Sequence, residues 1–211
     1  GLVELQWVVN AYNLTFAAFM LISGSLADIL GRKRVFIFGA TLFALCSLAS
    51  ALANNVLLLD VSRGLSGIGA AAMMTAGSAL LAQAYTGEQL AKAFAVFGSA
   101  AGAGLAIGPS LSGFLVGLAG WRSVFGLHLA VSIVILLLTV GISAGQETSG
   151  TSRIDWAGAG AFTPALFSFV LAIMQGPQLG WTSPLVMIAG AVCVVFGVLF
   201  ILVERKSSHP M

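Results

Sequence analysis

Long apolar runs separated by short polar breaks make up most of the chain. The runs cover residues 8–29, 35–53, 56–85, 90–118, 124–141, 156–174 and 184–203. A helix of about 20 apolar residues crosses a hydrocarbon core about 30 Å thick, and each run is close to that length or longer. The pattern therefore predicts an all-α membrane protein with about seven transmembrane helices.

The composition supports a membrane environment. Hydrophobic residues make up 59% of the 211 residues, charged residues make up 8%, and the mean hydropathy is +1.04. A soluble globular surface could not be built from so few charged residues, so we expect a lipid bilayer as the surrounding medium. The net charge of +2 is too small to suggest nucleic acid as a partner. Cys46 and Cys193 lie inside apolar runs and are expected to be buried apolar residues, and we expect no metal and no cofactor.

The basic residues predict how the helices are oriented across the membrane. Cytoplasmic connections carry an excess of Lys and Arg. If the GRKR segment lies inside the cell, Arg122 falls outside. The basic residues that then fall on the cytoplasmic side are Arg32, Lys33, Arg34, Lys92, Arg153, Arg205 and Lys206. The C-terminal tail is therefore expected in the cytoplasm.

Charged residues and glycines join the first predicted helix to the second. The segment contains Gly24, Asp28, Gly31, Arg32, Lys33 and Arg34. One interpretation is a tight cytoplasmic turn whose charge sets the topology. The other is a charged hinge, because a carboxylate, a glycine that permits a sharp turn and three cations can pair differently in two conformations.

A charged residue lies inside the third predicted helix. Arg63 is seven residues, or roughly 10 Å, from the start of this run at residue 56. An Arg near the bilayer centre costs on the order of 2.5–3.5 kcal/mol on insertion scales, which makes it a functional candidate. Asp60 lies three residues earlier, within ion-pairing reach on the same helix face, so a structural role stays open. Gly67 and Gly69 would let a neighbouring helix or a substrate approach closely.

Glycines and one proline crowd the fourth predicted helix. They are Gly98, Gly102, Gly104, Gly108, Pro109 and Gly113. Pro109 removes a backbone hydrogen bond and clashes with the preceding turn, so we expect a kink there. Small residues crowd the third and fourth helices and let helices approach closely, so we expect a close-packing fourth helix and a packed core formed by the helices before residue 145.

Taken together and in this order, the three segments resemble the major facilitator superfamily, most closely its fourteen-helix drug/proton antiporters. GSLADILGRKR is similar to the loop between helices two and three of that family, RGLSGIGAA to its helix-four motif, and GLAIGPSLSG to its antiporter motif in helix five. Ile29, Ser66 and Ser112 depart from the family pattern, which usually has Arg, Gln and Gly at these positions. The resemblance covers nearly the whole chain.

The resemblance implies a secondary active transporter that works by alternating access, in which two helical bundles rock about a central site. It implies proton-coupled efflux of small drug-like or toxic molecules across the plasma membrane, and no enzymatic activity. Arg63 with Asp60 would couple transport to protons, and the charged segment 24–34 would act as a conformational latch. The antiporter motif at the bundle interface would comprise Gly104, Gly108, Pro109 and Gly113.

The resemblance also divides the chain. On this register it covers about helices two to eight, and the first helix and the C-terminal half lie outside it. Residues 1–144 would form most of the N-terminal bundle, residues 145–155 a cytoplasmic loop, and residues 156–211 two linking transmembrane helices and a cytoplasmic tail.

Three alternatives stay open at this point. A proton-coupled uptake transporter for nutrients or other solutes would use the same scaffold. An intramembrane serine protease would use Ser66 of the GLSG sequence as nucleophile and His128 as base. A retinal or signalling receptor is disfavoured because Lys33, Lys92 and Lys206 all fall in loops or the tail. Outside the protease hypothesis, we expect His128 to be a helix residue with satisfied hydrogen bonds near the outer interface.

Overall fold

The computed structural model describes residues 2–141 and 156–206, which form seven helices. They are α1 (Leu2–Leu30), α2 (Arg32–Ala51), α3 (Val56–Ala84), α4 (Gly87–Ala119), α5 (Arg122–Val140), α6 (Trp156–Leu179) and α7 (Pro184–Lys206). Each of them contains a stretch long and apolar enough to cross a membrane. The predicted fold class is confirmed. The predicted loop 145–155 lies outside the described residues.

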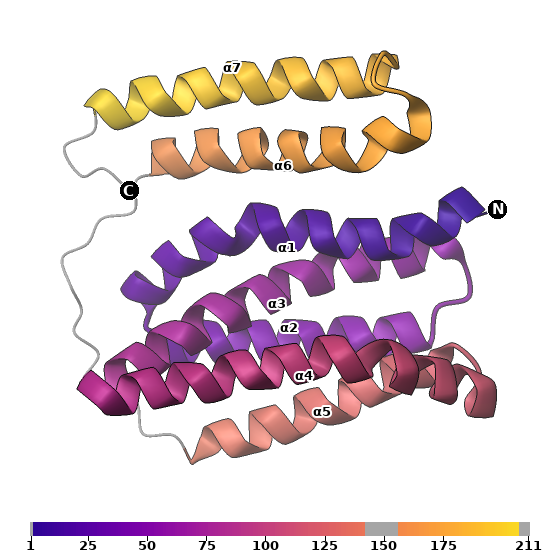
Figure 1. Ribbon diagram of the computed structural model, residues 1–211, viewed down its shortest axis with the longest axis vertical. Coiled ribbons are helices and arrows are strands. Elements are labelled where there is room, and N and C mark those ends of the chain that lie inside the picture. Colours follow the sequence, from indigo (N-terminus) through magenta and orange to yellow (C-terminus); the bar gives the residue numbers. More distant parts are fainter. Residues whose placement is uncertain (1, 142–155, 207–211) are drawn as a thin grey trace.

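Helices that follow one another in the sequence run in opposite directions (Figure 1). The helices α1, α2 and α3 form the centre, and α3 packs extensively against both of the others. On one side lie α4 and α5, and on the other the α6–α7 pair lies beside α1. The turns α1–α2 and α3–α4 share one end of the bundle, which we call the basic end because Arg32 and Lys92 lie there. Arg122 begins α5 at the opposite end.

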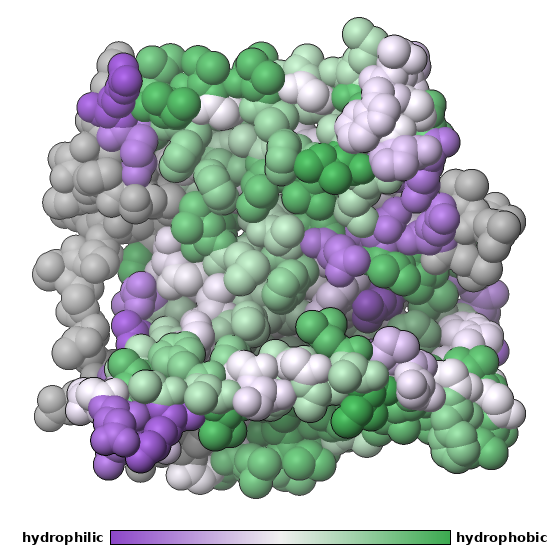
Figure 2. All heavy atoms as spheres, viewed as in Figure 1, coloured by the Kyte–Doolittle hydropathy of each residue, from purple (hydrophilic) through white to green (hydrophobic). Residues whose placement is uncertain are grey.

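The outer surface of the bundle is apolar. Leu105 on α4 and Val140 on α5, for example, are 81% and 79% exposed. Figure 2 shows hydrophobic residues over most of one face, with hydrophilic residues gathered mainly toward the helix ends. Exposed apolar area of this extent is typical of a surface that contacts lipid. The chain is therefore a multi-pass membrane protein.

Glycines bring α3 close to two neighbouring helices. A Cβ atom on Gly69 would lie 2.7 Å from the Gly39 carbonyl oxygen on α2, and a Cβ atom on Gly39 would lie 2.6 Å from the Gly69 carbonyl oxygen. A Cβ atom on Gly67 would overlap the side chain of Thr15 and the backbone of Tyr12 on α1. Carbon contacts need about 3.5–4.0 Å. The three backbones can approach this closely only because these glycines have no side chain.

The packing of α4 differs from the expectation. None of its residues is buried, and a Cβ atom on any of its glycines within the helical run, Gly98, Gly102, Gly104, Gly108, Gly113 and Gly117, would meet nothing within 4 Å. The expectation of a closely packed fourth helix is therefore wrong for the described residues. The reason is that α4 contacts α3 and α5 over short lengths, so no described helix covers its glycine face. The helix continues through Pro109.

Two helix ends lie five or six residues farther out than the apolar runs indicate. The first helix begins at Leu2 instead of residue 8, and α6 continues to Leu179 instead of ending at residue 174. The polar break at residues 175–177 includes Pro177, yet this proline is tolerated near the end of the helix. The end comes at Gly180, whose φ of +85° a residue with a side chain rarely adopts.

Candidate functional site

Arg63 lies on α3, about two turns from a capped helix start. The Asn55 side-chain oxygen accepts a hydrogen bond of 2.7 Å from the Leu58 backbone N–H, which stabilises the start of α3. Arg63 is half-buried, and its guanidinium contacts residues of α1 and α5. Its positive charge therefore lies inside a bundle of membrane-spanning helices.

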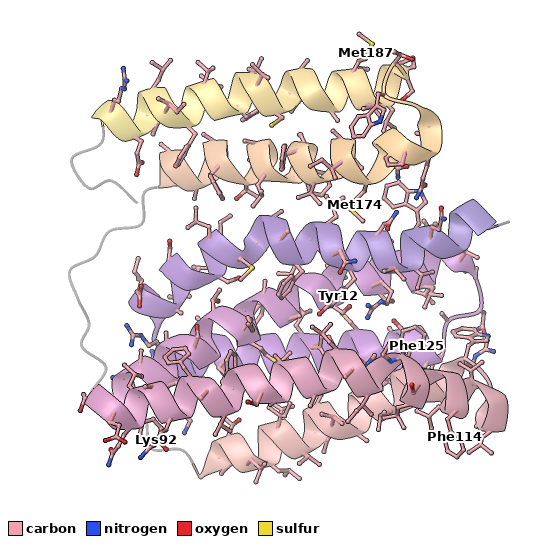
Figure 3. The ribbon with its side chains drawn as sticks, in the orientation of Figure 1. Tyr12, Lys92, Phe114, Phe125, Met174 and Met187 are labelled. Carbon is pink, nitrogen blue, oxygen red and sulfur yellow. The ribbon has the colours of Figure 1, made fainter. Side chains whose placement is uncertain are left out.

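The guanidinium of Arg63 is held by α1, by its own helix and by two aromatic rings. Its Nε donates to the Val8 carbonyl oxygen at 3.3 Å, and its Nη1 donates to Ser66 Oγ at 3.3 Å. Its central carbon lies 4.4 Å from the ring centroid of Tyr12 and 5.8 Å from that of Phe125. Cation–π contacts contribute about 0.5–2 kcal/mol, which offsets part of the cost of placing Arg in a membrane. In Figure 3, Tyr12 and Phe125 both lie in the half of the bundle where α1 begins.

A hydroxyl group reinforces the same contact between α1 and α3. Thr15 Oγ1 on α1 donates to the Gly64 carbonyl oxygen on α3 at 2.6 Å. Gly67, one turn farther along α3, packs against the same part of α1. The segment of α1 that Arg63 contacts is therefore joined to α3 at several successive points. A movement of the Arg63 side chain would change this contact directly.

Ser66 and His128 are not paired as a protease would require. The buried Ser66 hydroxyl donates to the Arg63 carbonyl oxygen at 2.8 Å and accepts the bond from the Arg63 guanidinium. His128 Nδ1 is buried and has no hydrogen-bond partner among the described residues. A serine nucleophile needs a base within hydrogen-bond reach. The arrangement gives the protease hypothesis no support.

The expectation that the hydrogen bonds of His128 are satisfied is wrong at Nδ1. The imidazole lies edge-on to the Phe43 ring of α2 at 5.9 Å and to the Phe125 ring of α5 at 6.3 Å, measured between centroids. Aromatic rings, which are poor hydrogen-bond partners for a ring nitrogen, therefore take the place of polar partners. His128 and Arg63 consequently contact the same Phe125 ring.

A cavity of about 540 Å³ lies at the end of the bundle opposite the basic end. Its lining is mostly apolar and includes Val8 and Phe125, the two residues that contact Arg63 from α1 and α5. Arg122 also lines it, and Arg122 Nη2 donates to the Ala53 carbonyl oxygen at 2.9 Å. The cavity therefore leads from this end of the bundle to the residues that hold Arg63.

The predicted latch joins α1 and α2 at the basic end. Gly31 alone connects the two helices, with a φ of +97° that favours glycine. Arg32 Nη2 and Nε donate to Asp28 Oδ1 at 3.1 and 3.3 Å, and Arg32 Nη1 donates to the Ala79 carbonyl oxygen of α3 at 2.9 Å. An exposed i,i+4 ion pair contributes only about 0.3–0.5 kcal/mol. The bond to Ala79 is the one that ties this hinge to a third helix.

The remaining predicted site residues are spread over four helices. Gly24 lies within α1, and a Cβ atom there would meet nothing within 4 Å. Lys33 is half-buried and Arg34 is exposed, both in the first turn of α2. Asp60 is half-buried one turn before Arg63. The motif around Pro109 lies on the uncovered face of α4, so the structure does not bring it to Arg63.

Sequence reasoning missed Tyr12 and Phe125 as partners of Arg63. Tyr12 belongs to the WVVNAY segment and Phe125 to GWRSVF, and in both segments the aromatic residues look like ordinary residues at helix ends. Only the tertiary structure shows that one ring from α1 and one ring from α5 converge on the guanidinium of α3. The one signal in the sequence was Arg63 itself, because an arginine inside a membrane needs partners on neighbouring helices.

Apolar spanning helices around a half-buried arginine define a polytopic membrane protein with a charge among its helices, which is a functional candidate. The Major Facilitator Superfamily matches residues 1–209. The chain belongs to this superfamily, as the order of its motifs indicated.

Relatives in this superfamily include named resistance proteins. The chain is 36% identical over 208 residues to the multidrug resistance protein Stp of Mycobacterium tuberculosis, and the match covers 98% of this chain and 39% of that protein. It is 35% identical to the methylenomycin A resistance protein of Bacillus subtilis, over 97% of this chain and 44% of the relative. The multidrug transporter protein MdtP of Bacillus subtilis is 33% identical, and the match covers 100% of this chain and 39% of that protein. The chain thus spans about two fifths of the length of these relatives.

Proposed function

We propose that the full-length protein exports small drug-like or toxic molecules across the plasma membrane in exchange for protons. The observation that carries the proposal is a guanidinium placed among the spanning helices of a major facilitator chain and held by a carbonyl oxygen and aromatic rings. The names of the relatives, which refer to multidrug and antibiotic resistance, support a drug-like substrate.

Proton coupling would act through the charge of Arg63. A guanidinium stays protonated throughout, and its positive charge stabilises the ionised form of a carboxylate that comes near it. Asp60, one turn away on α3, is the nearest candidate in the sequence. Proton binding to a carboxylate and movement of Arg63 would then be linked, and α1 would respond because Arg63 contacts its Val8 carbonyl and Tyr12 ring.

Alternating access needs contacts that can break and a surface for a second bundle. The Arg32–Ala79 bond would hold the α1–α2 hinge against α3 in one state and release it in the other. The glycine face of α4 would contact the partner bundle, with residues 1–144 as most of one bundle and a cytoplasmic C-terminal tail. The uncovered state of that face within the described residues supports this role.

Transport by everted membrane vesicles that contain the full-length protein tests the proposal. When the vesicle interior is acidified, ethidium should accumulate inside as protons leave. Arg63→Ala should slow accumulation at least tenfold, and Arg63→Lys should do nearly the same because an ammonium lacks the planar stacking surface. Lys92→Ala is the control for loss of a positive charge, since Lys92 is exposed at the basic end, where it pairs with Glu88 at 2.8 Å.

Two results would contradict the proposal. Unchanged ethidium accumulation by Arg63→Ala would remove Arg63 from the coupling mechanism. Movement of ethidium out of the vesicles together with protons would instead indicate a proton-coupled uptake transporter.

A further inference from the structure

His128 on α5 lies against a ring of α2, and the proposed role of Arg63 leaves this histidine unused. His128 Nδ1 is buried and has no hydrogen-bond partner among the residues that the structure describes. The imidazole contacts the rings of Phe43 and Phe125. The Arg63 guanidinium lies 5.8 Å from the centroid of the same Phe125 ring. A protonatable nitrogen and a permanent cation therefore share one aromatic neighbour.

The other ionisable groups at this level of the bundle come from the helices around α5. They are Tyr12 of α1, Cys46 of α2, and Asp60 and Arg63 of α3. Arg122 begins α5 itself and donates to the Ala53 carbonyl oxygen, and the cations of α2 lie in its first turn at the basic end. The charged residues of α4, which also packs against α5, are Glu88 and Lys92 in its first two turns at the basic end. In Figure 3, Lys92 and Phe125 lie toward opposite ends of the bundle. Arg63 is therefore the neighbour whose charge a protonated His128 would oppose.

A neutral imidazole and a guanidinium can lie against the same ring without repulsion. An imidazolium cannot do so at low cost, because two positive charges in a partly buried site destabilise one another. The side chain of Arg63 is long and has rotatable bonds, whereas His128 is held between two rings. Protonation of the histidine would therefore move the arginine and leave the imidazole in place.

We propose that His128 is a proton-binding residue of the transport cycle, whose protonation displaces Arg63 from the Tyr12 and Phe125 rings. This inference rests on the proposed proton-coupled function. A hydronium ion gives its proton to the lone pair of the neutral imidazole, so that an N–H bond forms as an O–H bond breaks and water leaves. The same nitrogen later gives that proton back to water on the other side of the membrane. The cavity of about 540 Å³ leads to Phe125 and supplies the approach from one end of the bundle.

Displacement of Arg63 would loosen the contact between α1 and α3. The hydrogen bond to the Val8 carbonyl oxygen and the Tyr12 contact would both be lost, while the Thr15–Gly64 bond would remain. The first part of α1 would then be able to move relative to α3. A proton bound at His128 and Arg63 seated on α1 thus exclude one another, which is the property that an exchange mechanism needs.

Proton release upon substrate binding tests the inference. Full-length purified protein is mixed with ethidium in weakly buffered detergent solution near pH 6, and a pH-sensitive dye reports the protons released. Wild type should release protons, and His128→Asn should release at least twofold fewer, because asparagine does not titrate. His209→Asn is the control, since His209 is the second of the two histidines in the sequence. Thermal unfolding checks that each variant is folded, and His128→Gln replaces His128→Asn if that variant is not.

The outcomes separate this inference from the function on which it rests. If His128→Asn released as many protons as wild type and the pH dependence of its ethidium efflux were unchanged, the role of His128 would be overturned and proton-coupled export would be left intact. Absence of proton release from wild type itself would overturn the proposed proton coupling, and the role of His128 with it.

Discussion

Gly69→Ala tests whether α2 and α3 pack through their backbones. The added Cβ atom would lie 2.7 Å from the Gly39 carbonyl oxygen and 2.9 Å from the Phe43 nitrogen, two main-chain atoms that no side-chain rotation can move. Overpacking costs about 1–3 kcal/mol, and the upper end, about 3 kcal/mol, applies to a clash with backbone. Alanine gains about 1 kcal/mol over glycine in helix propensity. We therefore expect a net loss of stability of about 2 kcal/mol.

Thermal unfolding of the full-length protein in detergent measures this difference. The matched control is Gly160→Ala on α6, because Gly160 is exposed and a Cβ atom there would meet nothing within 4 Å. Gly69→Ala should lower the unfolding temperature by on the order of 2 °C, whereas Gly160→Ala should leave it unchanged or raise it. The reasoning is refuted if Gly69→Ala is as stable as Gly160→Ala.

Three further substitutions test the contacts of α1 and α2. Thr15→Val keeps the side-chain size and removes the hydroxyl that donates to the Gly64 carbonyl oxygen. Thermal unfolding should show a loss of stability of about 0.6 kcal/mol that Thr15→Ser does not share. Equal stability of the two variants would exclude that bond as a contributor. Gly31→Ala forces a side chain into a φ of +97° and should destabilise the protein by about 1–3 kcal/mol in the same assay; no change would show that the turn can relax. Arg32→Gln removes the bond from the guanidinium to the Ala79 carbonyl oxygen and should alter the rate of ethidium transport. The affinity for ethidium, measured by fluorescence, should stay within twofold of wild type. An unaltered transport rate would argue against a latch.

The apolar pattern was sufficient to predict the helices because spanning a bilayer requires about 20 apolar residues with satisfied backbone hydrogen bonds. Seven runs became seven helices among the described residues. Pro177 shows where this reasoning fails, since it looked like a break and lies inside α6. Pro177 removes one backbone hydrogen bond without ending the helix, and the actual end depends on the backbone conformation of Gly180.

Glycine content predicted possible close contacts but not which of them form. Gly67 and Gly69 lie at helix crossings, while the glycines of α4 face open space within the described residues. The difference depends on which helix lies opposite each face, and one sequence does not contain that information. Likewise, the cost of an intramembrane charge singled out Arg63, but its partners Tyr12 and Phe125 became visible only with the tertiary arrangement of α1, α3 and α5.

Proton movement driven by a substrate gradient tests the central claim most directly. Proteoliposomes that contain the full-length protein are loaded with ethidium and a pH-sensitive dye, diluted into medium of the same pH, and held at zero membrane potential with K⁺ and valinomycin. Exchange predicts that ethidium leaving the liposomes brings protons in, so the interior acidifies with wild type and stays unchanged with Arg63→Ala. An interior that stays at its starting pH with wild type, or that becomes alkaline, would contradict proton-coupled export through Arg63.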